Sequence, residues 1–167
     1  VIATGRLAIA SLLILPLMGM RHRIAIRTLG RRHLLIAVVS GAFLALHFAT
    51  WISSLSYTSI ANSVLLVNTV PIWTALGGLV LGVDRLDRRG WLAVGLAVIG
   101  TVIVSAPSAD LTGDGLLGNV LALVGGAAMA AYLLCGRALR ARLDLVPYVM
   151  LAYGVAAVIL LSVTLAA

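Results

Sequence analysis

Apolar residues run along this chain in six long stretches that are separated by short polar connections. A helix needs about 20 apolar residues to cross about 30 Å of hydrocarbon, because each residue advances it by about 1.5 Å. Each stretch reaches or nearly reaches that length. We therefore predict an all-α, polytopic bundle of six membrane-spanning helices, at residues 2–20, 34–55, 58–82, 90–106, 115–136 and 146–167.

The segment Ser40–Leu81, which covers most of the second and third predicted helices, carries an unusual set of side chains. It has no Asp, Glu, Lys or Arg, yet it holds a His, two Asn, two Trp and a Pro. A polar group in hydrocarbon costs free energy unless the protein satisfies it. So many polar groups at this depth indicate that these two helices line a cavity.

In the second predicted helix, four side chains that can form hydrogen bonds share one face. His47, Thr50, Trp51 and Ser54 follow the i, i+3, i+4, i+7 spacing. A single histidine in a membrane helix often serves only in packing. Because His47 shares its face with a hydroxyl and an indole N–H, we favour a cavity-lining role for His47 and Trp51.

In the third predicted helix, Ser59, Asn62, Thr69 and Trp73 fall within about 80° of one another at 100° per residue, and Asn68 points away. We therefore assign Asn62, Thr69 and Trp73 to the cavity and expect Asn68 to form an interhelical hydrogen bond.

The same helix carries a proline near its middle. Pro71 has no N–H to donate to the carbonyl of Val67, and its ring presses against that carbonyl. A carbonyl freed at this depth needs a partner, which a neighbouring helix or a substrate could supply. Prolines also occur in membrane helices as plain kinks, so Pro71 joins the candidate cavity residues on the strength of its neighbours.

Composition agrees with a membrane protein. The chain is 62% hydrophobic and 10% charged, with a mean hydropathy of +1.17, against about 25% charged residues in an ordinary soluble domain. The net charge of +7 could indicate nucleic-acid binding. However, all but one of the 12 basic residues lie in three connections, at residues 21–33, 84–90 and 137–144. This is the pattern of a multi-span protein, so we expect no nucleic-acid partner.

The charge of the connections alternates along the chain. The two remaining connections, SLSYTS and SAPSADLTGDG, contain no arginine. Because arginine-rich loops stay in the cytoplasm, we predict a multi-pass protein of the cell membrane whose three basic connections are cytoplasmic. These connections are also expected to touch anionic lipid headgroups.

Arg6 is the one charged residue well inside an apolar stretch. Burial at mid-membrane would cost on the order of 3 kcal/mol. The predicted topology puts Arg6 near the outer end of its helix, where its side chain can reach the interface. Pairing with a substrate or another helix and anchoring at the interface therefore both stay open.

Motifs for enzyme chemistry are absent from the sequence. No predicted helix contains a carboxylate, and there is no H-E-x-x-H, no G-x-S-x-G, no P-loop and no Cys/His cluster of metal-binding spacing. The single cysteine, Cys135, excludes an internal disulfide. We expect neither enzyme activity, nor a cofactor, nor a metal.

Three segments together resemble the EamA-type transporters of the drug/metabolite transporter superfamily. LHFATWISSLSYTSIANSVLLVNTVPIWTALGGLVLG is similar to the family's third and fourth helices, and VDRL follows where the family has an acidic residue, arginine and leucine. GNVLALVGGAAMAAYLLCGRALR resembles the helix that opens the second repeat, and Arg6 matches an arginine near the start of the second helix. The departures are Asp84, where the family usually has Glu, and Asn119, where many members have Asp; the second leaves any coupling role there in doubt.

The resemblance implies a fold of ten helices in two inverted five-helix repeats, with both termini in the cytoplasm. Residues 1–106 would form the first repeat without its first helix, 107–114 an extracytoplasmic linker, and 115–167 the start of the second repeat. On this basis, and because both ends stop within apolar stretches, we expect the chain to be a piece of a longer protein.

The residues and the resemblance together predict a secondary transporter, an exporter of small polar or amphipathic metabolites, that works by alternating access. A structural or regulatory membrane protein with the same fold and a membrane-embedded enzyme are the alternatives. The candidate substrate-cavity residues are Arg6, His47, Trp51, Asn62, Thr69, Pro71 and Trp73.

Overall fold

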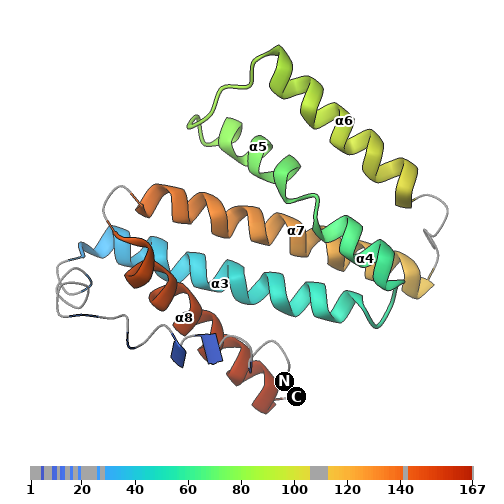
Figure 1. Ribbon diagram of the computed structural model, residues 1–167. Coiled ribbons are helices and arrows are strands. Elements are labelled where there is room, and N and C mark those ends of the chain that lie inside the picture. The colour runs from blue at the N-terminus through green and yellow to red at the C-terminus, as the bar shows by residue number, and fades with distance from the viewer. Residues whose placement is uncertain are drawn as a thin grey trace. The chain divides into compact units, whose positions relative to one another are not determined.

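All the elements that the computed structural model describes are helices (Figure 1). It describes residues 29–105, 113–140 and 143–166, together with residues 5, 9, 10, 12, 13, 16, 19 and 26. The helices are α3 (Arg31–Ser54), α4 (Ile60–Val67), α5 (Val70–Val80), α6 (Arg88–Ser105), α7 (Gly113–Leu139) and α8 (Leu145–Ala166).

Five helical stretches are long and apolar enough to cross a membrane, and they correspond to the second to sixth predicted spans. They are Arg31–Ser54, Ile60–Val80, Arg88–Ser105, Gly113–Leu139 and Leu145–Leu165. The all-α membrane fold is therefore confirmed. Residues 107–112 of the predicted linker lie outside the described residues, and so do most residues of the predicted span at 2–20.

The polar hairpin predicted between the second and third spans ends one helix and starts the next. The carbonyl of Ser54 accepts hydrogen bonds from the N–H groups of Tyr57 and Thr58, at 3.0 Å each, so the chain turns out of α3. The Ser59 hydroxyl then accepts a bond of 3.2 Å from the N–H of Asn62 and caps the start of α4. A hydroxyl cap of this kind satisfies a backbone donor that has no partner within the helix.

The third span is not the single helix that we predicted. It is divided into α4 and α5, with Asn68 and Thr69 in a turn between them. Pro71 cannot donate to the Val67 carbonyl, so the regular ladder of hydrogen bonds stops there. That carbonyl lies against Gly126 of α7, where a Cβ atom would stand 2.9 Å from the Val67 oxygen. A glycine on the neighbouring helix thus leaves room for the break.

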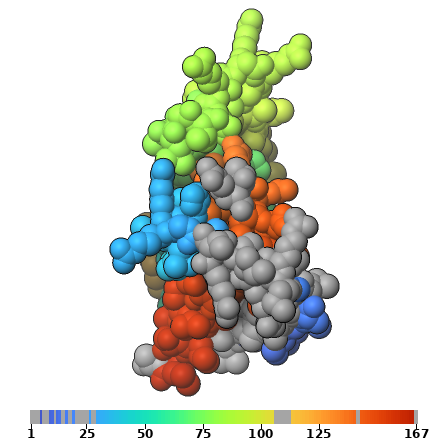
Figure 2. Space-filling view, turned by 90° about the vertical axis from the view of Figure 1, so that its left-hand side faces the viewer, coloured from blue at the N-terminus to red at the C-terminus, as the bar shows by residue number. Residues whose placement is uncertain are grey.

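The connection from α5 to α6 is exposed (green segment in Figure 2). Gly82 adopts a φ of +67°, a conformation that glycine reaches without strain. The Asp87 carboxylate then accepts a bond of 2.8 Å from the N–H of Gly90 and stabilises the first turn of α6. Helix α6 packs against α4 and α5 and has no buried residue.

The chain forms two compact units. The first combines Val1–Leu46 with Cys135–Ala167, and the second is His47–Leu134. Within the first unit, α3 and α8 meet where the Ser40 hydroxyl and the Tyr148 hydroxyl form a buried hydrogen bond of 2.6 Å. Gly41 lies directly against Val155 of α8, so the absence of a side chain permits this close approach.

Within the second unit, glycines of α7 let three other segments approach its backbone. A Cβ atom on Gly118 would stand 2.8 Å from Thr58, and one on Gly125 would stand 3.3 Å from the Cβ of Trp51. Gly126 faces the break between α4 and α5, as described above. Helix α7 is therefore the element around which the end of α3, α4 and the start of α5 are positioned.

Candidate functional site

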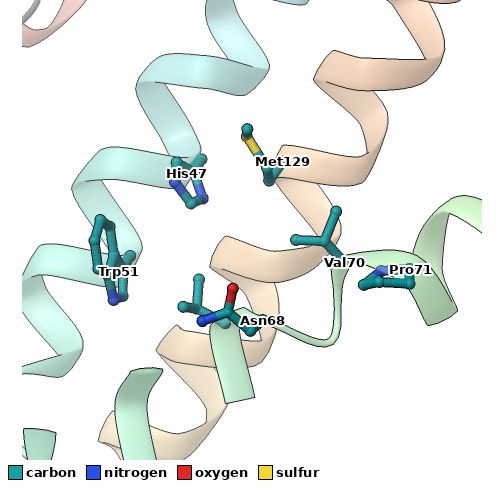
Figure 3. Close-up of a pocket in the computed structure, with 7 residues that line it drawn as sticks. His47, Trp51, Asn68, Val70, Pro71 and Met129 are labelled. Carbon is teal, nitrogen blue, oxygen red and sulfur yellow. The ribbon is translucent and has the colours of Figure 1, made fainter. Parts of the chain in front are cut away.

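The second unit contains a pocket of about 400 Å³ at the break between α4 and α5 (Figure 3). Helix α3 supplies two of its lining residues, the span divided into α4 and α5 supplies four, and α7 supplies one. We call it the His47 pocket, and it is lined by His47, Trp51, Val67, Asn68, Val70, Pro71 and Met129.

His47 is fixed in orientation by α7. Its Nδ1 atom lies 2.9 Å from the backbone oxygen of Gly125. A carbonyl oxygen can only accept, so Nδ1 carries the proton and donates, which makes Nε2 a hydrogen-bond acceptor in the neutral ring. Nε2 has no hydrogen-bond partner among the described residues, and it is not one of the buried side-chain atoms that lack a partner. Nε2 is therefore accessible. The His47 ring also stacks on Trp51, with centroids 5.6 Å apart and planes inclined by 25°.

The indole ring of Trp51 lines the pocket, while its nitrogen, Nε1, is buried away from solvent. The Nε1 atom is buried and has no hydrogen-bond partner within the described part of the chain. An indole N–H can only donate, and a buried donor without an acceptor costs about 1–3 kcal/mol. The accessible part of Trp51 is therefore its ring.

Asn68 lies in the turn that divides the third span, and it is exposed to the pocket. Its Nδ2 atom donates a bond of 2.7 Å to the carbonyl of Val64 in the preceding helix, α4. The predicted interhelical bond is therefore wrong. Figure 3 shows the side-chain oxygen of Asn68 turned into the space beside His47, Trp51 and Val70. The pocket is thus lined by a residue for which we expected an interhelical hydrogen bond.

A second pocket, of about 280 Å³, contains Thr69 and Trp73; we call it the Trp73 pocket. The Trp73 indole N–H donates a bond of 3.0 Å to the Thr69 hydroxyl, which in turn donates one of 2.7 Å to the Leu66 carbonyl. These polar groups therefore satisfy one another. Most of the other walls are apolar; the lining residues are Leu66, Thr69, Ile72, Trp73, Val98, Thr101, Val102, Ser105 and Leu123.

Asn62 lines neither of these pockets. It belongs to a buried polar group that we call the Asn62 cluster. The amide nitrogen of Asn62 and the hydroxyl of Thr58 both donate to the side-chain oxygen of Asn119 on α7, the second at 2.9 Å. The hydroxyls of Ser54 and Ser63 form a bond of 2.6 Å beside them. The Asn62 cluster ties α3, α4 and α7 together.

The sequence predicted part of this arrangement. His47, Trp51 and Pro71 come together in one pocket, and Thr69 and Trp73 in another, while Arg6 lies outside the described residues. We did not predict the roles of Asn68, Met129 and Asn119. Asn119 carried a signal, as an amide within an apolar helix, and so did the adjacent glycines of α7 that mark a close helix contact.

Comparison with known families gives a further finding. A family model described as the EamA-like transporter family matches residues 1–106, which include α3 to α6. The chain belongs to this family. No curated protein and no solved structure matches it.

Membership in the EamA-like family agrees with the five apolar helices, and together they make this chain a multi-pass membrane protein of the transporter class. The matched segment includes His47, Trp51 and the whole broken span. Within the described residues, no three His, Cys, Asp or Glu side chains gather in a way that could hold a metal ion.

Proposed function

We propose that this protein is a secondary transporter that exports small polar or amphipathic metabolites across the cell membrane, with the His47 pocket as its solute site. The observation that carries the proposal is the coincidence of a pocket, a broken membrane helix and accessible acceptors in one place. Broken helices with irregular backbone at membrane depth are typical of solute sites in transporters, because such backbone is tolerated only in protein or beside a water-filled cavity.

The size and lining of the His47 pocket support a small solute. Pockets for small molecules have volumes of about 300–1,000 Å³ and are mostly apolar, with a few polar groups that fix orientation. The His47 pocket has about 400 Å³, with apolar side chains from Val67, Val70 and Met129. His47 and Asn68 supply the orienting groups. An amphipathic metabolite matches both parts.

The transport cycle that we propose is alternating access between two inverted repeats. The first repeat would end near residue 106 and the second would open near residue 115. The arginine-rich connections at 21–33, 84–90 and 137–144 would lie in the cytoplasm, as the positive-inside rule requires. Thr69 and Trp73 would contact the solute from the Trp73 pocket. Asn62 would act from beside the path by holding α4 against α7. Arg6 would pair with a carboxylate or anchor its helix.

The test is solute flux into proteoliposomes by the purified full-length protein. We expect His47→Ala to lower flux about tenfold or more per folded molecule, because it removes an orienting group and one wall of the site. Trp73→Ala should lower it less, since the indole N–H is already paired. Ser162→Ala on α8, whose exposed hydroxyl bonds only within its own helix, is the control and should keep the wild-type rate.

Two outcomes would contradict the proposal. Wild-type flux after both His47→Ala and Asn68→Ala would remove the site assignment. A folded protein that carries none of a broad panel of metabolites would favour the alternative of a structural or regulatory membrane protein.

A further inference from the structure

The His47 pocket exposes more hydrogen-bond acceptors than donors. His47 Nε2 is an acceptor because Nδ1 donates to Gly125, and neither atom has another partner among the described residues. Asn68 presents its side-chain oxygen because its nitrogen is turned back to Val64. The donor that could have balanced them, the Trp51 indole N–H, is sealed from solvent. One N–H of the Asn68 amide is also left over, because the Val64 carbonyl takes only one of the two. Acceptors still outnumber donors, so the pocket favours a solute that brings its own donors.

The lining carries no charge. None of the residues that line the His47 pocket is Asp, Glu, Lys or Arg. An ion taken from water into such a site without a partner of opposite charge loses its hydration with little in return. A carboxylate is disfavoured further, because it would face the lone pairs of His47 and Asn68. The pocket thus favours an uncharged solute.

The walls also restrict the shape of the solute. The stacked rings of His47 and Trp51 form a flat surface, and Val70, Pro71 and Met129 supply apolar walls (Figure 3). Flat rings pack well against aromatic surfaces of this kind. The polar edge of the solute would then meet the two acceptors while its body covers the rings.

We propose that the His47 pocket binds an uncharged, flat solute that presents N–H donors, of the class of aromatic primary amides. This inference rests on the proposed function only for the claim that the bound solute is also transported. The binding claim stands on the geometry of the pocket.

Four probes of similar size separate the chemistries: benzamide, N,N-dimethylbenzamide, benzoate and the benzylammonium ion. Their affinities are measured by isothermal titration calorimetry on the full-length protein in nanodiscs, with empty nanodiscs as the blank. We expect benzamide to bind most tightly. N,N-dimethylbenzamide, which keeps the ring and the carbonyl but has no N–H, should bind about tenfold more weakly, as expected when two acceptors lose their donors. Equal affinities for these two, or tightest binding of benzoate or benzylammonium, would overturn the proposal.

Two variants separate hydrogen bonding from the greater bulk of the dimethyl compound. His47→Phe keeps a flat ring and removes the acceptor, and Asn68→Leu keeps a side chain of similar size without an oxygen. Each should reduce the tenfold preference for benzamide to about twofold, because one of the two acceptors remains. Ser162→Ala should leave the preference unchanged. A full preference in both variants would show that sterics cause it, which would overturn the proposal.

His47→Phe also removes the bond to Gly125, so its folding is checked by thermal unfolding; Asn68→Leu gives an independent answer, since the Asn68 side chain bonds only within α4. Tightest binding of benzoate that is lost in Arg6→Ala would assign a charged solute held by Arg6 and contradict the proposal.

Flux separates this inference from the proposed function. If benzamide binds as predicted but no solute crosses the membrane, transport is wrong and the solute class stands. If solutes cross but the probes show no preference for N–H donors, transport stands and the solute class is wrong.

Discussion

The His47 pocket and the Asn62 cluster both draw on α3, α4 and α7, and the pocket also on α5, but the polar atoms of the cluster are mostly buried whereas acceptors of the pocket are accessible. In the Asn62 cluster, two donors converge on one oxygen of Asn119, and neighbouring hydroxyls bond to each other. In the His47 pocket, Nδ1 of His47 donates to Gly125, while Nε2, an acceptor, has no partner among the described residues. The presence of polar residues at membrane depth therefore does not by itself identify a site; the His47 pocket differs in having an acceptor that is accessible and has no partner among the described residues.

Helix α4 and the turn that ends it show the difference over a short distance along the chain. Asn62 is 1% exposed and serves packing, whereas Asn68, six residues later on another face, is exposed at the pocket. Chemically identical side chains thus have different roles because one face of α4 meets α7 and the other meets an open space. Substitutions that are alike in chemistry but placed in these two regions should therefore have different effects.

The largest effect is expected where α7 touches the break. Gly126→Leu should lower the free energy of unfolding by about 3 kcal/mol, because the new side chain would overlap the Val67 carbonyl and nearby backbone. Unfolding in mixed detergent, followed by circular dichroism, measures this. The matched control is Gly95→Leu on α6, where a Cβ atom would meet open space. Equal losses in the two variants would show that the close approach at Gly126 does not hold the break in place.

The next effect separates the two regions by the same chemical change. Asn119→Leu should cost about 2 kcal/mol, because it removes the acceptor of the buried Asn62 amide and of the half-buried Thr58 hydroxyl. Asn68→Leu should cost less than about 0.5 kcal/mol, since an exposed bond within one helix is lost. The order should reverse for flux per folded molecule, where Asn68→Leu is the more harmful change. Similar losses of unfolding free energy in the two variants would contradict the distinction between the buried Asn62 cluster and the accessible His47 pocket.

A smaller effect is expected from the two tryptophans. The Trp73 indole N–H is hydrogen-bonded to Thr69, whereas that of Trp51 is buried without a partner. Trp73→Phe should therefore cost about 1 kcal/mol more in unfolding free energy than Trp51→Phe, since both changes remove similar ring area but only one breaks a bond. The comparison uses the same unfolding assay. A larger loss for Trp51→Phe would mean that its N–H has a partner in the membrane.

The sequence predicted the helices more fully than the site. Five predicted spans match because about 20 apolar residues in a row have few alternatives to a membrane helix. His47 and Trp51, which we predicted to share one face of a helix, line the same pocket, and their contact with a solute stays a prediction. A helical wheel shows that Asn62 and Asn68 lie on different faces but not which face meets a neighbour, so it could not show that Asn62 bonds to α7 while Asn68 lines a pocket. Beyond Asn68 the wheel no longer applies, since the break changes the register of Thr69 and Trp73.

Partners on other helices could not be predicted for a related reason. The contacts of Asn62 with Asn119, and of His47 with Gly125, join residues 57 and 78 positions apart. One sequence gives the periodicity of each helix, but not the rotation and sliding that set two helices against each other. For that reason the contacts of Asn119 and the place of Met129 in the pocket were found only in the structure.

The most direct test of the central claim is the reactivity of single cysteines with a water-soluble maleimide, in a Cys135→Ser background that removes the native thiol. The account predicts that Asn68→Cys reacts readily, because position 68 faces a watery pocket, and that a bound solute slows the reaction. Ser63→Cys, at a fully buried position in the Asn62 cluster, should stay unreacted until the protein unfolds. An unreactive Asn68→Cys in the folded protein, or equal reactivity at the two positions, would contradict it.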